Sequence, residues 1–146
     1  MLRILEKGYW TGIILGICFC GLITIIIVIE NKRYKNRIEK IKSEIPKNNM
    51  EKLKNSQYHN YESNNNFIVG TSYIYNVIDE KERVKIMLLY HKTPCNKYDT
   101  DFNIDEVYMS KEEFAAKKIK AGICVKTLHN TAPEVKFKIK EILDIE

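Results

Sequence analysis

The sequence has little of the residues that mark several protein classes. Its 146 residues include only 6 glycines, 4 cysteines and 3 histidines. These low contents exclude a collagen-like chain and a disulfide scaffold, and a hydrophobic content of 45% excludes a wholly disordered chain. Gly-rich phosphate loops, nucleophile elbows, paired-histidine zinc helices and dinucleotide fingerprints are also absent from the sequence. We therefore expect a non-enzymatic protein without a cofactor.

The positive charge is concentrated in one part of the chain. The formal net charge is +5, of which residues 30–66 carry +4, whereas residues 67–146 are neutral. Lys136, Lys138 and Lys140 alternate with apolar residues, which is typical of the solvent face of a strand. Nucleic acid is therefore not expected as a partner, because binding it requires a basic patch on the folded part.

One long apolar run lies near the N-terminus. After a short tail, residues 1–8, residues 9–29 form a run of 21 without any charge. At about 1.5 Å per residue, this run forms a helix of roughly 31 Å, which matches the hydrocarbon core of a bilayer. A signal peptide has a shorter apolar region that ends in small residues, whereas this run ends in Ile and Val before Glu30. We expect an uncleaved transmembrane helix in the cell membrane.

Basic residues follow the apolar run in a predicted juxtamembrane helix, residues 30–45. Lys32, Arg33, Lys35 and Arg37 are expected to lie near anionic lipid headgroups. Positive residues favour the cytoplasmic side, which predicts a cytoplasmic C-terminal domain. The N-terminal tail also carries positive charge, so an extracytoplasmic domain is the alternative.

Small residues recur every four positions in the apolar run, at Gly8, Gly12, Gly16 and Cys20. On a helix they form one ridge, along which a second helix can pack closely. The ridge predicts a membrane-protein partner or a homodimer. Glycine is also common in membrane helices, so unselective composition is the other interpretation.

Two features are expected between the membrane and the folded domain. Ile38, Ile41 and Ile45 form an apolar stripe on the juxtamembrane helix, which is too short for a coiled coil and predicts a solvated stalk. Residues 46–66 are polar and rich in asparagine and lysine, which predicts a flexible tether.

Residues 67–146 predict a small β-rich domain. The expected strands share alternating or apolar patterns, and they are 67–78, 84–90, 104–109, 123–127 and 135–140. Ser110 and Glu113 form a capping box that begins a helix, and Gly122 is expected to end it. The predicted class is α+β, with the order β-β-β-α-β-β in a partly closed barrel or curled sheet.

The stretch Glu106–Phe114, followed by Gly122-Ile123-Cys124-Val125, resembles uncharacterised bacterial single-pass membrane proteins that carry a small SH3- or OB-like β-barrel. In those proteins a strand precedes a short helix and a glycine-led strand. The resemblance implies the same architecture here, and it implies no activity.

Four residues form the one constellation that could bind a metal, namely His91, Cys95, Cys124 and His129. Two histidines and two cysteines are a ligand set that zinc prefers, provided that all four converge. Cys124 and His129 are five residues apart on a predicted strand, which places them on opposite faces unless the strand bulges. Zinc binding, a Cys95–Cys124 disulfide and unrelated packing remain open.

These observations predict a single-pass membrane protein whose β-rich domain is an interaction or scaffolding module. Two alternatives remain: a metal- or redox-responsive domain that uses the four residues above, and an extracytoplasmic domain of the cell-envelope or immunity type.

Overall fold

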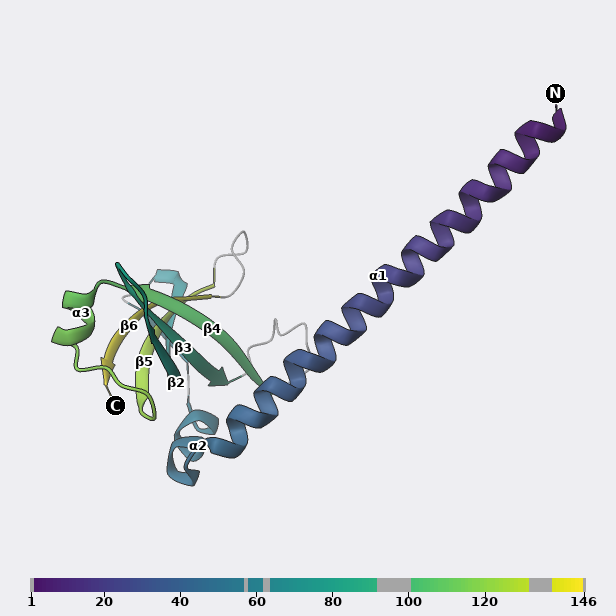
Figure 1. Ribbon diagram of the computed structural model, residues 1–146. Coiled ribbons are helices and arrows are strands. Elements are labelled where there is room, and N and C mark those ends of the chain that lie inside the picture. The colour runs from purple at the N-terminus through teal and green to yellow at the C-terminus, as the bar shows by residue number, and fades with distance from the viewer. Residues whose placement is uncertain (1, 57, 62–63, 92–100, 132–137, 146) are drawn as a thin grey trace. The chain divides into compact units, whose positions relative to one another are not determined.

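A computed structural model describes the chain except for residues 1, 57, 62–63, 92–100, 132–137 and 146 (Figure 1). The chain divides into two compact units, Met1–Arg37 and Ile38–Glu146. Its elements are α1 (Leu2–Glu44), α2 (Lys47–Lys54), β1 (His59–Tyr61), β2 (Asn64–Asp79), β3 (Val84–His91), β4 (Phe102–Met109), α3 (Lys111–Ala116), β5 (Cys124–Asn130) and β6 (Lys138–Ile145).

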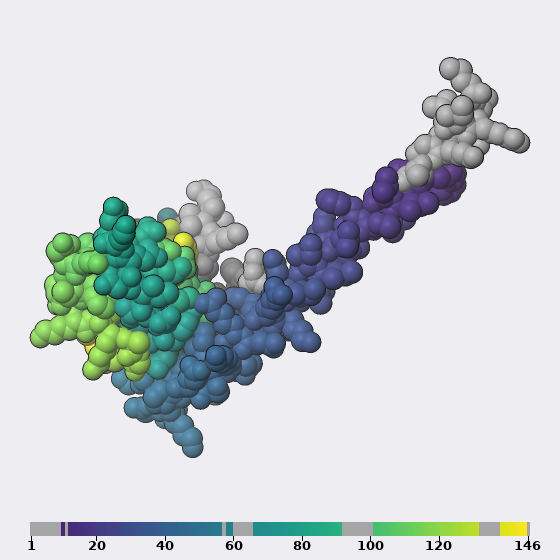
Figure 2. Space-filling view, in the orientation of Figure 1, coloured from purple at the N-terminus to yellow at the C-terminus, as the bar shows by residue number. Residues whose placement is uncertain are grey.

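Helix α1 contains the apolar run. The segment Gly12–Glu44 is long and apolar enough to cross a membrane, and none of its apolar window is buried (Figure 2). The large exposed side chains of this part are Trp10, Ile14, Leu15, Ile17, Phe19, Leu22, Ile23, Ile25, Ile26, Ile27, Val28 and Ile29. The expected long apolar helix is confirmed. By length and composition it suits a membrane anchor, although a signal sequence has the same properties.

The second unit is built on an antiparallel sheet with the strand order β4-β3-β2-β5-β6, and β1 pairs with β2 outside this path. Strand β2 is long enough to pair with more than one strand: Phe67–Tyr73 pairs with β5, and Ser72–Asp79 pairs with β3. The charged turn before Val84 closes on a hydrogen bond of 2.9 Å from the Glu80 amide to the Arg83 carbonyl. A sheet with flanking helices confirms the α+β class.

The sheet is not closed into a barrel. Among the described residues, no backbone ladder joins the two end strands β4 and β6. Asp105 on β4 bridges them instead, because its Oδ2 accepts a hydrogen bond of 2.9 Å from the Ile139 amide on β6. Its Oδ1 accepts a bond of 2.8 Å from the Glu106 amide.

The main core lies on one face of the sheet. It consists of buried apolar side chains from β2–β6 and the segment after α3: Ile74, Val84, Ile86, Leu88, Tyr90, Val107, Met109, Ile119, Val125, Ile139 and Ile142. The alternation of strand side chains directs every second residue into this core. Two register shifts in the β5–β6 pairing keep both Ile139 and Ile142 buried.

The end of α1 belongs to the folded unit, which corrects the predicted solvated stalk. Ile38 is only 1% exposed, and Ile41 and Ile45 are also buried. Lys42 lies on the same turns, with its Nζ 5.5 Å from the centre of the Phe102 ring at the start of β4. The three isoleucines therefore pack against their own chain. This packing removes their apolar surface from water without a partner helix.

Residues 46–66 are also ordered in large part, in contrast to the predicted flexible tether. Pro46 precedes α2, and Leu53 on this helix is 0% exposed. The side chain of Asn49 donates a hydrogen bond of 3.1 Å to the Gly122 carbonyl, 73 residues away. The sequence did not predict this helix, because the average composition of the segment is polar and does not reveal its single buried leucine.

Helix α3 begins as expected and ends early. Ser110 is its N-cap, and its Oγ accepts a hydrogen bond of 3.1 Å from the Glu113 amide. The helix ends at Ala116, not near Gly122. The chain turns first at Lys118, whose φ is +50°, and again at Gly122, whose φ is +91°. Two left-handed residues therefore separate α3 from β5, where one had been expected.

Candidate functional site

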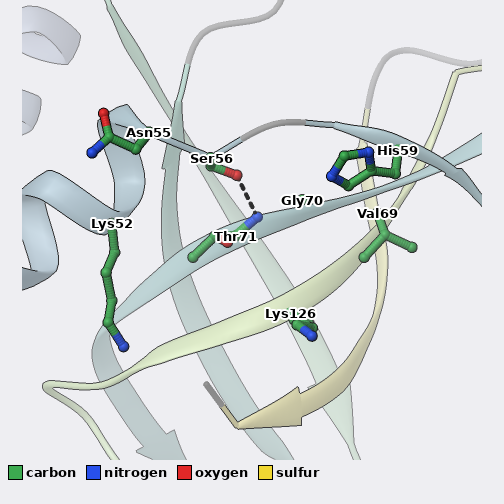
Figure 3. A pocket seen from close by; sticks show the side chains of 8 residues that line it. All are labelled: Lys52, Asn55, Ser56, His59, Val69, Gly70, Thr71 and Lys126. Atoms are coloured by element: carbon green, nitrogen blue, oxygen red, sulfur yellow. Dashed lines mark hydrogen bonds between the residues drawn. The ribbon is translucent and has the colours of Figure 1, made fainter.

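A cleft of about 560 Å³ lies where α2, β1, β2 and β5 meet (Figure 3). The cleft is part of the unit Ile38–Glu146. The residues that line it are Lys52, Asn55, Ser56, His59, Val69, Gly70, Thr71 and Lys126. This site was not predicted from the sequence, because it depends on the strand pairing that brings Lys126 beside residues 52–71.

Strand β2 forms the floor of the cleft because it has a neighbour on each side at this point. His59 on β1 lies opposite Val69, and Lys126 on β5 lies opposite Thr71. Lys52 comes from the last part of α2. The side chains of Lys52, His59 and Lys126 thus surround the floor from three different elements (Figure 3).

The segment after α2 is attached directly to this floor. Asn55 is the C-cap of α2, and its backbone amide donates a hydrogen bond of 2.9 Å to the Glu51 carbonyl. The Oγ of Ser56 accepts a hydrogen bond of 2.8 Å from the Thr71 amide (Figure 3). This bond fixes the wall of the cleft to its floor.

Gly70 is required by a close approach of Tyr58. A Cβ atom at position 70 would lie 2.3 Å from Cε1 of the Tyr58 ring, which is far shorter than any van der Waals contact. The Tyr58 hydroxyl in turn donates a hydrogen bond of 3.0 Å to the His91 carbonyl. Burial raises the pKa of Tyr58 well above its usual value, so that the phenol stays protonated and can donate.

A buried polar network lies beside Gly70, on the face of the sheet that carries the main core. The Oγ of Ser72 and Oγ1 of Thr127 are 2.6 Å apart, and Oγ1 of Thr127 is 2.8 Å from Nε2 of His129. Thr127 also donates to the Gly70 carbonyl over 3.2 Å. Because a hydroxyl has one proton, Thr127 then accepts from both Ser72 and His129, which places a proton on Nε2 of His129.

His129 is 0% exposed and lies between two tyrosine rings. Its ring centroid is 5.3 Å from that of Tyr58 and 5.1 Å from that of Tyr90, both in edge-to-face arrangements. Burial lowers the pKa of His129 from 6.5 to about 4. The imidazole is therefore neutral at physiological pH and serves as a structural hydrogen-bonding group.

The structure does not bring the four candidate metal ligands together, as far as the chain is described. His129 lies in the polar network, whereas Cys124 lies on the opposite face of β5, where its thiol is 3.9 Å from the Asn49 carbonyl. His91 packs against Phe102, with ring centroids 5.5 Å apart. Cys95 lies outside the described residues. Within the described ranges, no three His, Cys, Asp or Glu side chains are grouped to hold a metal ion.

The small-residue ridge of α1 is open where its side chains are described. A Cβ atom at Gly12 or Gly16 would meet no atom within 4 Å, and Cys20 is exposed. Gly8 is helical, but its surroundings lie outside the described side chains. Thr24, the next member of the series, donates its hydroxyl to the Cys20 carbonyl over 2.9 Å, so it brings no unpaired polar group to the ridge.

The basic flank also lies on α1. Lys32, Arg33 and Arg37 are exposed, and Lys35 is half-buried. Lys138 and Lys140 are exposed on β6, as expected for the solvent face of that strand, whereas Lys136 lies outside the described residues.

Comparison with known proteins gives no relative: no family model, no curated protein and no solved structure matches this chain. The resemblance to bacterial single-pass proteins with a small barrel stays a prediction.

Proposed function

We propose that this chain is a non-enzymatic, single-pass membrane protein whose β-rich domain is an interaction or scaffolding module. The observation that carries the proposal is the long apolar helix α1, of which no part of the apolar window is buried. Such a surface is unfavourable in water and favourable in a bilayer. The end of the same helix buries Ile38, Ile41 and Ile45 within the second unit.

Association along α1 is the second part of the proposal. The open ridge of Gly12, Gly16 and Cys20 offers a close approach to a second helix, either of another copy or of a different membrane protein. Van der Waals packing drives such pairing in lipid, where apolar side chains alone give no preference for protein over lipid. The absence of bulk at these positions is therefore the feature that favours a partner.

A membrane two-hybrid assay with the full chain tests this association. The double substitution Gly12→Ile with Gly16→Ile should reduce the reporter signal to that of a non-associating helix, because two branched side chains then separate the backbones. Gly21→Ile is the matched control, since Gly21 is equally open but lies about 100° around the helix from Cys20. An unchanged signal in the double variant would exclude the ridge as the contact surface.

The predicted location of the domain is the cytoplasm. The flanking segment that contains Lys32, Arg33, Lys35 and Arg37 is positively charged, and such segments favour the cytoplasmic side of the membrane. Labelling of Cys95 in intact cells with a membrane-impermeant thiol reagent tests this. The buried Cys124 is an internal control, because it should react only after unfolding. Labelling of Cys95 from outside would instead assign the domain to the cell exterior and support an envelope or immunity role.

We further propose that the curled sheet acts as a partly closed barrel of the SH3- or OB-like kind. The contact of Asp105 with the Ile139 amide supports this, because it joins β4 and β6 where the backbone ladder is missing. The likeness of Glu106–Phe114 and Gly122–Val125 to small barrel proteins supports the same architecture.

A further inference from the structure

We propose that the cleft between α2, β1, β2 and β5 is a binding site for a phosphate-bearing anion. The first argument is the charge of the lining: Lys52, Lys126 and His59 contribute cationic or hydrogen-bond-donating groups, and none of the eight described lining residues is acidic. This is a different role from helix association, and it does not depend on the ridge of α1.

The second argument is geometric. Lys126 lies opposite Thr71 and His59 lies opposite Val69, so the two side chains lie on the two flanks of β2. Lys52 reaches the cleft from α2, so the side chains of Lys52 and Lys126 come to it from two different elements (Figure 3). Three donors that surround a common space suit a tetrahedral group with several acceptor oxygens. Lysine binds phosphate as a point charge and needs no planar match.

The third argument is that these charges are not used elsewhere in the described parts of the chain. Ion pairs there engage Lys42, Arg83, Lys85, Lys111 and Lys117, but not Lys52 or Lys126. The acid opposite Lys126 on β6 is Asp144, which is exposed and makes no ion pair with it. The lysines therefore remain available to a ligand anion.

Neutral donors complete the site. Ser56 Oγ already accepts a hydrogen bond from the Thr71 amide, so the hydroxyl proton of Ser56 can be donated to an oxygen of a bound phosphate. Asn55 adds a carboxamide at the rim. Two ammonium groups, an imidazole, a hydroxyl and a carboxamide match the dense acceptor surface of a phosphate better than that of a single carboxylate.

The size of the cleft restricts the ligand further. A volume of about 560 Å³ exceeds that of inorganic phosphate, and the cleft is open to solvent. It can hold the phosphate together with part of the group that carries it. Two sources share this chemistry: a soluble phosphate ester, and the headgroup of an anionic phospholipid.

Lysine acylation followed by mass spectrometry can test the proposal on the full chain in phosphatidylcholine nanodiscs. A trace dose of an acetylating reagent measures the reactivity of each lysine. In one arm, glycerol 3-phosphate is added at constant ionic strength, with chloride as the replaced ion. In the other arm, phosphatidylglycerol replaces part of the phosphatidylcholine and no soluble phosphate is present. Lys54 and Lys120, which are exposed and do not line the cleft, are controls within the same molecule.

We expect the reactivity of Lys52 and Lys126 to fall by at least about threefold, with Lys54 and Lys120 unchanged, because a bound anion occupies the two ammonium groups. Protection in the first arm assigns a soluble ester, and protection in the second arm alone assigns a lipid headgroup. In the variant Lys52→Gln, half-maximal protection of Lys126 should require about tenfold more ligand, since a charge-assisted hydrogen bond is lost. Lys54→Gln should leave this ligand concentration unchanged. Equal change at all four lysines, or no change in either arm, would overturn the proposal.

Discussion

Acidification should destabilise the folded sheet through His129. The imidazole is 0% exposed, is hydrogen-bonded to Thr127, and lies between the rings of Tyr58 and Tyr90. A second proton on the imidazole would place a positive charge in a site that is shielded from solvent. Burial accordingly lowers the pKa of His129 from 6.5 to about 4 in the folded chain, whereas the unfolded chain keeps the ordinary value.

The magnitude follows from proton linkage. Between pH 6.5 and pH 4 the unfolded state binds the proton more tightly, so the free energy of unfolding falls as the pH falls through this window. For these two pKa values, the loss between pH 7 and pH 5 is about 2 kcal/mol, and it reaches about 3 kcal/mol below pH 4. Asp105 acts in the opposite direction, because burial raises its pKa and the folded state then gains stability from its protonation.

Hydrogen exchange of the β5 amides, followed by mass spectrometry on the full chain in detergent micelles, measures this loss. After correction for intrinsic exchange, the opening free energy of Cys124–Asn130 should fall from pH 7 to pH 5, by at most about 2 kcal/mol because Asp105 offsets part of the His129 contribution. In the variant His129→Gln the stability at pH 7 should be lower, and the dependence on pH should be much weaker. Asp105→Asn removes the opposing carboxyl and should steepen the dependence. An equal pH dependence in wild type and His129→Gln would refute the linkage to this imidazole.

Three further predictions concern the residues around this network. Gly70→Ala should cost about 1–3 kcal/mol in the free energy of unfolding, because its Cβ would clash with the Tyr58 ring, and adding Tyr58→Ala should make the glycine substitution nearly neutral in the same exchange measurement. Thr127→Val should cost about 1–3 kcal/mol by leaving buried partners unsatisfied, and adding Ser72→Ala in a double-mutant cycle should cost less than the sum of the single changes; additive costs would contradict the hydroxyl pair. Asp105→Ala should speed the exchange of the β6 amide that it accepts from, at Ile139, more than that of the central β2–β3 amides, and uniform acceleration would show that the carboxylate does not join the sheet ends.

Local patterns predicted those parts of the fold that local physics determines. The uncharged run predicted the apolar part of α1, and alternation placed β3 at 84–90 against an observed Val84–His91. The last strand was predicted at 135–140 but extends to Ile145, and β1 was not predicted. Ser110 predicted its helix start because the N-cap involves only residues three positions apart. The early end of α3 at Ala116 was not predicted, because Lys118 adopts a left-handed conformation that is uncommon for lysine.

Long-range packing accounts for the larger errors. The stripe of Ile38, Ile41 and Ile45 was visible in the sequence, but nothing local distinguishes a solvated stalk from a helix that packs on its own domain. Leu53 has the same ambiguity within a polar segment. The cleft depends on the register that brings Lys126 beside Thr71, and no spacing of these residues along the chain could have indicated it.

Membrane insertion of α1 is the central claim, and extraction of cell membranes with alkaline carbonate tests it most directly. The full chain should stay in the membrane pellet at its unprocessed mass. The variant Leu22→Lys with Ile26→Lys should appear in the soluble fraction, because each exposed apolar side chain is replaced by a charge that costs about 2.5–3.5 kcal/mol at the centre of a membrane helix. Protection of the β5 amides in that variant would show that its domain is still folded. Release of the wild-type chain by carbonate, or a soluble chain shortened by cleavage after the apolar run, would contradict the account.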